Sequence, residues 1–267
     1  MQEIAIVYMV AGISSRFGGK IKQFAEVGQN GESLIEYSLD QAISAGFSKI
    51  VFIVGNLTEK PFKEKFGESF KGVPIIYALQ KFDIKERDKP WGTLDALATV
   101  KGLIDCPFVV CNGDDIYGEE AFKIIYDHLS KNKECAAIGY SLGNVLPEEG
   151  SVNRGIFEIE NGCVKDIEEV FDIRKDNLIS KNLELNAMCS MNFFGMNAPV
   201  LDMLNAVLIS FKEKNKGDKR VECLLPVEIG NLIKKGDIVM KIYPTKESWF
   251  GVTNPGDEAI VKEKLRK

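Results

Sequence analysis

The sequence predicts an α/β fold: a mostly parallel sheet with helices on both faces, and a smaller β-rich portion. In the first half of the chain, apolar runs typical of buried strands alternate with segments of helical periodicity. From about residue 150 this alternation gives way to a hairpin pattern and longer helices. No Pro-, Gly- or Ser-rich linker separates the two parts. We therefore expect one domain over residues 1–267, with halves at about 1–145 and about 146–267.

The elements of the first half follow one another regularly. An apolar strand at 4–10 leads through a glycine-containing loop to a helix at 33–47, which Gly46 ends. Thr93 is the expected N-cap of a later helix. The other expected strands are 49–55, 73–79, 107–115 and 135–142, and the other expected helices are 93–104 and 119–131.

The second half begins with the strongest short hairpin signal in the chain. Asn161-Gly162 divides the segment 154–169, "RGIFEIENGCVKDIEE", into two strands. We expect these later elements to form a lid-like portion on the same sheet. They are a strand at 186–196, helices at 198–214 and 223–236, a strand at 237–244 and a short C-terminal helix.

Composition and charge exclude some classes of function. The formal charge of −5 argues against a nucleic-acid partner, because a phosphate backbone is usually met by a basic field. No apolar run approaches the roughly 20 residues of a membrane span, and the first residues show no basic-then-apolar signal. We therefore expect a cytoplasmic protein that binds neither nucleic acid nor membrane.

Cysteine and histidine give little support for a metal centre or a nucleophile. The six cysteines are scattered without a CxxC pair, mostly in apolar stretches, and are expected to be small buried side chains. The one histidine, His128, lies in a helical pattern, and we expect it at the helix surface. A single histidine also disfavours Ser/His/Asp and Cys/His arrangements.

The loop after the first strand, "VAGISSRFGGKIKQF", has the composition of a phosphate-binding segment. It does not have the spacing of a Walker P-loop or of GxGxxG. Ala11 and Gly12 lack bulk, so their backbone N–H groups can approach an anion closely. Arg16 can donate to two phosphate oxygens at once, and Lys22 can supply a point charge. The alternative is a flexible surface loop with solvated cations.

Two further polar segments also follow strands. Asp114 and Asp115, in "NGDD", are adjacent acids that repel each other unless a cation lies nearby, and Mg²⁺ prefers a few carboxylates plus phosphate oxygens. A solvated turn before a helix is the alternative. Gln80 has an amide that suits a base edge, although an ordinary structural glutamine is equally open. Because ligands of such sheets bind beyond the carboxyl ends of strands, we expect the loop, Gln80 and the acids to meet in one crevice.

At these residues the chain resembles the sugar-1-phosphate nucleotidyltransferases, also called nucleoside-diphosphate-sugar pyrophosphorylases. The family's first loop reads small-Ala-Gly-x-x-x-Arg with a lysine several residues on, although its usual proline before that lysine is Ile21 here. "PWGTLDAL" and "NGDDIYG" match the family's Gly-Thr and Gly-Asp segments. "RGIFEIENGCVKDIEE" resembles its sugar-contacting hairpin, and "SWFGVTNPGDEA" its C-terminal segment. The resemblance implies a Rossmann-like sheet of the nucleotide-diphospho-sugar transferase type with a sugar-binding β-rich portion.

The resemblance also implies roles for single residues. Arg16 and Lys22 would be catalytic cations on the phosphates, and Asp114 would hold the catalytic Mg²⁺. The nucleotide would be bound by Ala11, Gly12, Gln80, Gly92 and Thr93, and the sugar pocket would be lined by Gly155, Glu169 and Asn192.

Two departures from the family pattern affect these roles. Many members have a lysine after the glutamate that matches Glu169. This chain has Val170, so the charge for a sugar phosphate would come from Arg174 or Lys175. Many members also use the aspartate of a "W-x-D" segment as second Mg²⁺ ligand, where this chain has Gly251. Its replacement is expected to be Thr253, Asn254 or Asp257, or a water.

The expected reaction is the formation of an NDP-sugar and pyrophosphate from an NTP and a sugar 1-phosphate, with Mg²⁺. UTP or dTTP is the preferred nucleotide, and related enzymes often assemble as homo-oligomers. Two alternatives stay open. "KQF" after the loop also resembles the cytidylyltransferases that act on a polyol or amino-alcohol phosphate. A catalytically silent nucleotide-sugar sensor would keep the crevice without turnover.

Overall fold

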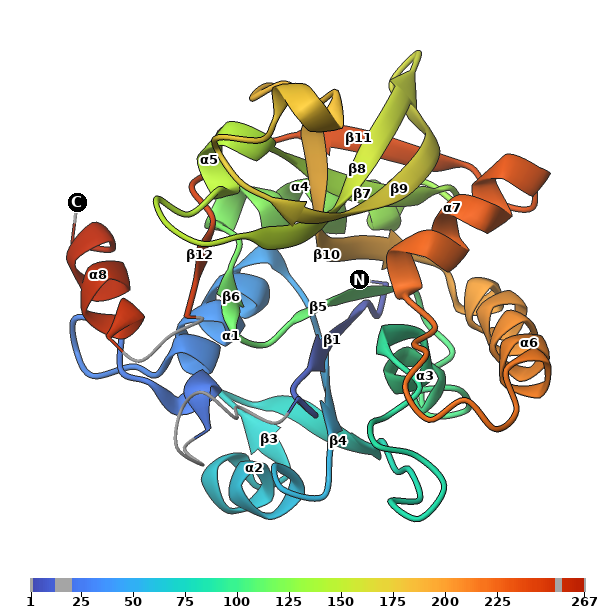
Figure 1. Cartoon of the computed structure of the whole chain (residues 1–267). Helices are drawn as coiled ribbons and strands as arrows, with labels where there is room; N and C mark the ends of the chain where they lie inside the picture. Colours follow the sequence, from blue (N-terminus) through green and yellow to red (C-terminus); the bar gives the residue numbers. More distant parts are fainter. Residues whose placement is uncertain (1, 13–20, 253–255, 267) are drawn as a thin grey trace.

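A computed structural model describes residues 2–12, 21–252 and 256–266 of the chain. In this part of the chain, ten strands form one sheet through the molecule (Figure 1). These strands are β1 (Ala5–Met9), β2 (Lys49–Val54), β3 (Ser69–Phe70), β4 (Val73–Leu79), β5 (Phe108–Asn112), β7 (Cys135–Ser141), β8 (Val152–Glu160), β9 (Cys163–Ile173), β10 (Met188–Met196) and β11 (Met240–Pro244). Their order is β3-β4-β2-β1-β5-β10-β7-β11-β9-β8, and a separate two-stranded ribbon pairs β6 (Asp115–Ile116) with β12 (Phe250–Gly251).

The centre of the sheet is parallel, as predicted. β1 pairs with β2 on one side and with β5 on the other, and β4 lies beyond β2. Residues Ala5 to Tyr8 of β1 are completely buried. Burial on both faces explains the continuous apolar run from which this strand was predicted.

The other half of the sheet is mixed rather than mostly parallel. β10 runs antiparallel to both of its neighbours, β5 and β7, and β8 and β9 form an antiparallel hairpin at the far edge. β11 adds one more parallel pairing, with β7. β10 also pairs antiparallel with β8, so it runs in the same direction as β9, the strand that precedes it in the chain.

Helices cover both faces of the sheet and create two hydrophobic cores. One core contains apolar residues of α1, α2 and α4, and the other contains those of α3, α6 and α7. Alternate residues of β1 belong to different cores, Tyr8 to the first and Val7 to the second. The helices are α1 (Leu34–Ala45), α2 (Glu59–Phe66), α3 (Thr93–Ala98), α4 (Glu119–Lys131), α5 (Leu142–Val145), α6 (Ala198–Lys214), α7 (Leu225–Lys235) and α8 (Asp257–Lys264).

Two sequence signals are confirmed at the level of backbone angles. Gly46 ends α1 in the left-handed conformation, with φ +114°. Asn161 and Gly162 connect β8 to β9 with φ +52° and +73°, as the predicted tight hairpin turn requires.

Two predictions about helices are wrong. Thr93 is not the N-cap of α3, because Gly92 holds that position and the Thr93 hydroxyl accepts a hydrogen bond from the backbone N–H of Leu225. The helix also ends at Ala98, earlier than expected. In addition, helix α2 was not predicted, because it is short and mostly charged. Its contribution to the core is limited to Phe62 and Phe66, one turn apart.

His128 is the clearest correction to an expected position. It is buried, with 4 % of its surface exposed, and its ring nitrogens lie 2.9 Å from the Tyr243 hydroxyl and 2.9 Å from the carbonyl of Glu134. The periodicity of α4 indicates which face of the helix is apolar, but not that Tyr243 of β11 and the carbonyl before β7 offer polar partners there. His128 is therefore a structural connection between α4 and the sheet.

The cysteines lie as predicted. Five of them are buried, Cys163 is half-buried, and all six are free thiols. Among the helices of the described ranges, none combines the length and apolar character needed to traverse a bilayer.

Candidate active site

The residues expected to bind a nucleotide follow neighbouring parallel strands at one edge of the sheet. Ala11 and Gly12 follow β1, Gly113 follows β5, and Gln80 follows β4. Small side chains are required where these segments meet. A Cβ on Gly113 would lie 2.3 Å from a methyl carbon of Val10. Only glycine therefore fits at residue 113, beside the side chain of Val10, unless the two segments move apart.

Lys22 and Asp114 form an ion pair at this edge. Lys22 begins a single 3₁₀ turn, Lys22–Phe24, and its ammonium group donates a hydrogen bond to Oδ2 of Asp114. Both side chains keep 23 % of their surface exposed, so a ligand can reach them. Arg16, the other predicted catalytic cation, lies outside the described residues, so its role stays a prediction.

Asp115 is the buried member of the acidic pair. It is 5 % exposed, and its Oδ2 accepts a hydrogen bond of 2.8 Å from Nδ2 of Asn112. Burial, and then the charge of Asp114, raise the pKa of Asp115 from 3.8 to about 7; the Asn112 bond and the charges of Arg154 and Lys22 act against this rise. The two adjacent acids therefore differ strongly in environment, since Asp114 faces a cation at the surface and Asp115 lies inside.

The β6–β12 ribbon brings the C-terminal segment to Asp115. Gly251 pairs with Asp115, and Val252 donates its N–H to the carbonyl of Asp114 over 3.3 Å. A Cβ on Gly251 would lie 2.9 Å from Oδ1 of Asp115. Of the expected replacements for the missing acid at 251, Thr253 and Asn254 lie outside the described residues, and Asp257 begins α8.

A chain of polar contacts links the acids to the middle of the sheet. Nδ2 of Asn192 lies 3.4 Å from Oδ1 of Asn112, whose own amide nitrogen donates to Asp115. Asn192 has φ +58° and lies in an irregular stretch of β10 between Ser190 and Phe194. Asparagine tolerates this left-handed conformation better than most residues, and bulges of this kind often direct a side chain toward a site. The structure thus brings Asn192 close to the acidic pair.

The β8–β9 hairpin contributes the remaining predicted pocket residues. Gly155 pairs with Glu169, and a Cβ on Gly155 would lie 3.5 Å from Oε2 of Glu169 and 2.9 Å from a methyl carbon of Ile167. Burial raises the pKa of Glu169, and the positive charge of Arg154 acts in the opposite direction. Arg154 lies opposite Val170 in the register of the hairpin.

The two cations proposed to replace a lysine at 170 lie just after the end of the hairpin. Arg174 forms exposed ion pairs with Asp172 and Asp176, and Lys175 forms one with Glu148. Both side chains are more than 40 % exposed and already have carboxylate partners. The geometry therefore gives more weight to Arg154, which sequence reasoning did not consider.

Gln80 is held in one orientation by its neighbours. Its amide nitrogen donates to Oδ2 of Asp95 over 2.8 Å and to the carbonyl of Gly92 over 3.3 Å. Asp95 is buried and forms an ion pair with Lys212 of α6. Both amide hydrogens are therefore engaged, and the carbonyl oxygen of Gln80 is the group available to a ligand.

Gly92 is required by the backbone itself. Its φ is +101°, and a Cβ there would lie 2.6 Å from the carbonyl oxygen of Cys223. The segment before α7 passes directly over this position, since Cys223 accepts the N–H of Leu94 and donates its own N–H to Trp91. The glycine of "PWGT" thus has a structural reason that is independent of any ligand.

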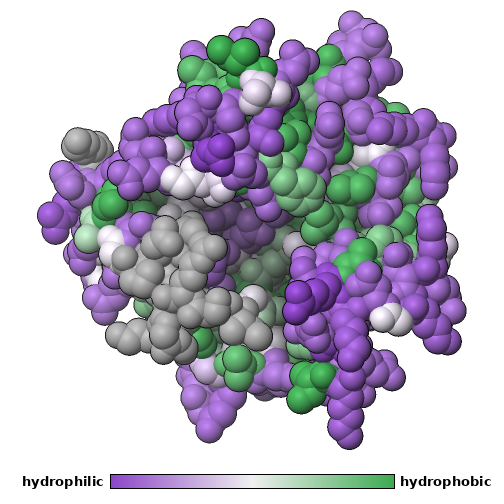
Figure 2. Space-filling model, viewed as in Figure 1, coloured by the Kyte–Doolittle hydropathy of each residue, from purple (hydrophilic) through white to green (hydrophobic). Residues whose placement is uncertain are grey.

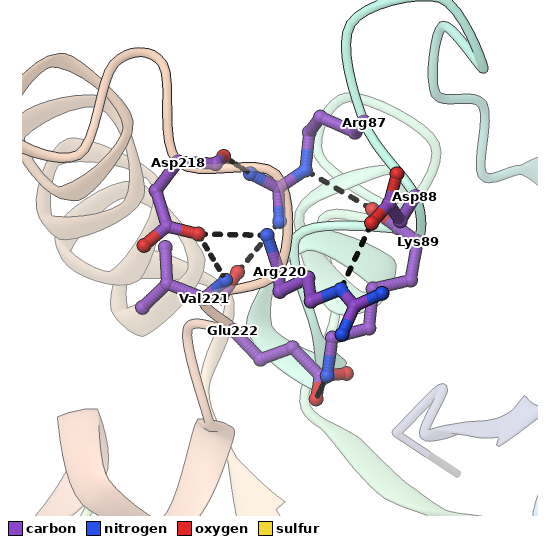
Figure 3. A network of polar contacts seen from close by, with 7 residues as sticks. All are labelled: Arg87, Asp88, Lys89, Asp218, Arg220, Val221 and Glu222. Carbon is purple, nitrogen blue, oxygen red and sulfur yellow. Dashed lines mark hydrogen bonds and ion pairs between the residues drawn. The ribbon is translucent and has the colours of Figure 1, made fainter.

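A network of polar contacts holds that segment in place (Figure 3). The buried guanidinium of Arg87 donates to the carbonyls of Lys89, Asp218 and Val221 over 3.0, 2.5 and 2.6 Å. It also lies 3.4 Å from the centre of the Trp91 ring. Two exposed ion pairs, Arg220–Asp88 and Lys89–Glu222, join the same two loops. The network positions Gly92 and Thr93 beside Gln80.

The space-filling view shows a hollow at the centre of the face of the molecule that is turned to the viewer in Figure 1 and Figure 2. It lies where Figure 1 places β1 and β5, between the β8–β9 hairpin above and β4 below, and both hydrophilic and hydrophobic residues are visible in its depth. A separate cavity of 730 Å³ lies at the opposite ends of β7 and β11, beside Cys135 and Val239. That cavity is far along the strands from the edge at which the polar residues gather, so we do not assign the site to it.

Sequence reasoning missed Asn112, Arg154 and Trp249. Asn112 could have been found from its place in "NGDD", at the carboxyl end of a strand. Arg154 precedes the predicted pocket residue Gly155, but nothing in its spacing indicates a role. The indole of Trp249 lies 5.5 Å from the guanidinium carbon of Arg154, a contact between distant parts of the chain.

Comparison with known proteins identifies a family and a fold. The model of one protein family, described as nucleotidyl transferase, matches residues 19–170, more than half of the chain. No curated protein matches the sequence.

Three solved structures share the fold at low sequence identity. A putative glucose-1-phosphate thymidylyltransferase from Bacillus anthracis, in complex with a sucrose, has a TM-score of 0.72 and 14 % identity, over 99 % of this chain and 96 % of that one. The inositol-1-phosphate CTP transferase from T. maritima has a TM-score of 0.67 and 15 % identity, over 100 % and 97 %. A UDP-glucose pyrophosphorylase complexed with UDP-glucose has a TM-score of 0.67 and 16 % identity, over 100 % and 99 %.

Proposed function

The chain belongs to the nucleotidyl transferase family, and from this premise we propose that it joins an NTP to a sugar 1-phosphate, releasing pyrophosphate and forming an NDP-sugar. The observation that carries the proposal is the link between two sets of residues. Lys22 pairs with Asp114 just after β5, and the next residue, Asp115, is connected through Asn112 to Asn192. Arg154 of the β8–β9 hairpin is close enough to Asp115 to affect its pKa. A nucleotide side and a sugar side therefore meet at the acidic pair.

The proposed reaction needs positioning and charge neutralisation rather than a protein nucleophile. An oxygen of the sugar phosphate attacks the α-phosphorus of the NTP in line, the bond to the bridging oxygen breaks, and pyrophosphate leaves. Two anions must approach each other, so cations fixed at the site lower the barrier. Lys22 would neutralise the α-phosphate and Arg16 the leaving pyrophosphate. Ala11 and Gly12 would offer backbone N–H groups, with Thr93 beside the base.

The acidic pair fits a magnesium ion that arrives with a nucleotide. Among the described residues, no group of three or more His, Cys, Asp and Glu side chains is arranged to hold a metal. Mg²⁺ commonly uses one or two carboxylates and completes its shell with phosphate oxygens and waters. Asp114 would be the first carboxylate and Asp115 the second, in place of the acid absent at 251. The ion would supply charge neutralisation at the phosphates.

The orientation of Gln80 supports UTP or dTTP as the nucleotide. Both of its amide hydrogens are engaged by Asp95 and Gly92, so its carbonyl oxygen would accept a hydrogen bond from the base. Uracil and thymine carry an N–H at position 3, whereas the same position of cytosine is an acceptor. This argues against the cytidylyltransferase alternative, which the "KQF" run and the fold shared with an inositol-1-phosphate CTP transferase keep in view.

The decisive experiment is an assay of pyrophosphate release. The four common NTPs, together with dTTP, are each combined with glucose 1-phosphate, other sugar 1-phosphates, inositol 1-phosphate and phosphocholine. We expect release with UTP or dTTP and a sugar 1-phosphate in the presence of Mg²⁺, and none in EDTA. Asp114→Asn is the matched control against a contaminating enzyme. Nucleotide-sugar binding without release from any pair would contradict the proposal and favour the silent sensor.

Location and assembly also belong to this proposal. A cytoplasmic enzyme agrees with the six free thiols, which persist in a reducing compartment. We propose no partner beyond the two substrates and further copies of the same chain.

A further inference from the structure

Two side chains beside the hairpin carry hydrogen-bond donors that lack an acceptor. Nε of Arg154 and Nε1 of Trp249 are buried, and neither has a hydrogen-bond partner among the described residues. The guanidinium carbon of Arg154 lies 5.5 Å from the centre of the Trp249 ring, so the two donors belong to one cluster. Both groups can donate but cannot accept. The group that satisfies them must therefore be an acceptor.

Among the described residues, no carboxylate is in ion-pair contact with the guanidinium of Arg154. Its Nη1 donates to the carbonyl of Asn153 over 3.0 Å. Residues 13–20 and 253–255 contain no Asp or Glu that could supply such a contact. Arg87 shows the contrast, because three carbonyls accept from its buried guanidinium. A partly buried cation without such compensation is unfavourable unless an anion completes its surroundings.

Arg154 lies between the acidic pair and the predicted sugar pocket. The ring of Trp249, 5.5 Å from the guanidinium carbon of Arg154, lies beside Gly251, where a Cβ would be 2.6 Å from that ring and 2.9 Å from Oδ1 of Asp115. Arg154 is also adjacent in sequence to Gly155, which pairs with Glu169. Lys22, by contrast, is paired with Asp114 on the nucleotide side. The two cations therefore serve different sides of the acidic pair.

We propose that Arg154 and Trp249 bind the phosphate group of the second, phosphorylated substrate through the guanidinium and Nε1. The inference rests on the proposed function for the identity of that substrate. A phosphate offers several acceptor oxygens and a negative charge for direct contact with the guanidinium, and arginine matches its geometry well. Arg154 of β8 would thus supply the positive charge that the sequence analysis expected from Arg174 or Lys175.

Kinetics with both substrates tests the assignment. Arg154→Met removes the charge and keeps an unbranched side chain, Arg154→Lys keeps the charge without the fork, and Trp249→Phe removes the indole N–H and keeps an aromatic ring. Arg174→Met, directly after β9, is the control. We expect Arg154→Met to raise the KM for the sugar 1-phosphate about 10- to 100-fold, with the KM for the NTP changed less than about twofold. Arg154→Lys should be intermediate, Trp249→Phe milder, and Arg174→Met unchanged. Equal increases of both KM values would overturn the assignment and leave the proposed function intact.

Binding of inorganic phosphate tests the site without turnover. Calorimetry with phosphate is run on the wild type and the same variants, after thermal melts confirm that each is folded. We expect Arg154→Met to weaken phosphate binding at least tenfold and Arg174→Met to bind like the wild type. Equal phosphate affinity in the wild type and in Arg154→Met and Trp249→Phe would overturn the proposal. Phosphate binding that depends on Arg154, without pyrophosphate release from any substrate pair, would count against the proposed function alone.

Discussion

Oδ1 of Asp115 lies next to the place that a Cβ on Gly251 would take. The two residues pair across the β6–β12 ribbon, and a Cβ added to Gly251 would be 2.9 Å from that oxygen. The family resemblance implies an acid at residue 251. This chain has an acid on the opposite strand of the same ribbon, so a carboxylate oxygen lies close to residue 251 although its backbone comes from a different segment.

Asp115 gives the free energy of unfolding a distinctive pH dependence. Its pKa is raised to about 7 in the folded protein, against an ordinary value of 3.8, because burial disfavours the charged carboxylate. The folded state therefore retains this proton to higher pH than the unfolded state. The stability contributed by the neutral carboxyl group is complete below about pH 4 and is lost as the pH rises through 7. Asp115→Asn cannot ionise and should remove that loss.

Denaturant unfolding in EDTA between pH 4 and 8 measures the difference. We expect the wild type to lose stability relative to Asp115→Asn as the pH rises. Asp114→Asn serves as the second variant. It removes a neighbouring negative charge that contributes to the raised pKa, so the loss should move to lower pH. Parallel stability curves for wild type and Asp115→Asn over this range would contradict the assignment.

Loss of either member of the Lys22–Asp114 pair should abolish most turnover. Lys22→Ala or Asp114→Ala is expected to lower kcat by about 10²–10³-fold, the usual effect of removing one group that stabilises charge in a transition state. Lys49→Ala is the control, because its ion pair with Glu3, at 2.6 Å, lies at the start of β2, the end opposite Gln80 and Asp114. Thermal melts should show that all three variants are folded. A folded Lys22→Ala or Asp114→Ala enzyme with near-normal turnover would refute these roles.

The sequence predicts the elements best where local pattern and tertiary packing agree. Residues 119–131 and 198–214 form α4 and α6 with the predicted bounds, since apolar side chains recur on one face of each. The turn at Asn161-Gly162 was predictable for the same kind of reason, because its backbone angles are a local property. The parallel centre of the sheet follows from the βαβ order.

The remaining features depend on contacts between distant segments. The antiparallel insertion of β10 between β5 and β7 is set by the path of the chain after the hairpin. His128 is buried because Tyr243 offers it a partner. Likewise, the cluster of Arg154 and Trp249 joins residues almost a hundred positions apart in the chain. Periodicity and motif spacing carry no information about such pairs, which is why the acids and Lys22 could be chosen from sequence and Arg154 could not.

Gln80 should control the choice between pyrimidine bases. Its fixed carbonyl oxygen can accept a hydrogen bond from N3–H of uracil or thymine, and Gln80→Met removes that acceptor. We expect kcat/KM for UTP or dTTP to fall about 10- to 100-fold and the preference over CTP to shrink by a similar factor. Gln41→Met on α1 is the control. A preference over CTP that survives Gln80→Met unchanged in a folded enzyme would show that another group reads the base.

Gly92 and Gly102 provide a matched test of why the "PWGT" glycine is required. Both have positive φ, +101° and +81°, but Gly92 also has ψ −169°, a region that essentially only glycine adopts, and a Cβ there would lie 2.6 Å from the carbonyl oxygen of Cys223, whereas Gly102 has open space around it. Gly102→Ala should therefore cost only the backbone strain, about 1–2 kcal/mol. Gly92→Ala must also displace the segment before α7, so we expect a clearly larger loss of stability in urea unfolding. Because this shift would move Gln80's partner carbonyl at residue 92, the KM for the NTP should rise as well. Equal destabilisation by the two substitutions would mean that the contact with Cys223 does not limit residue 92.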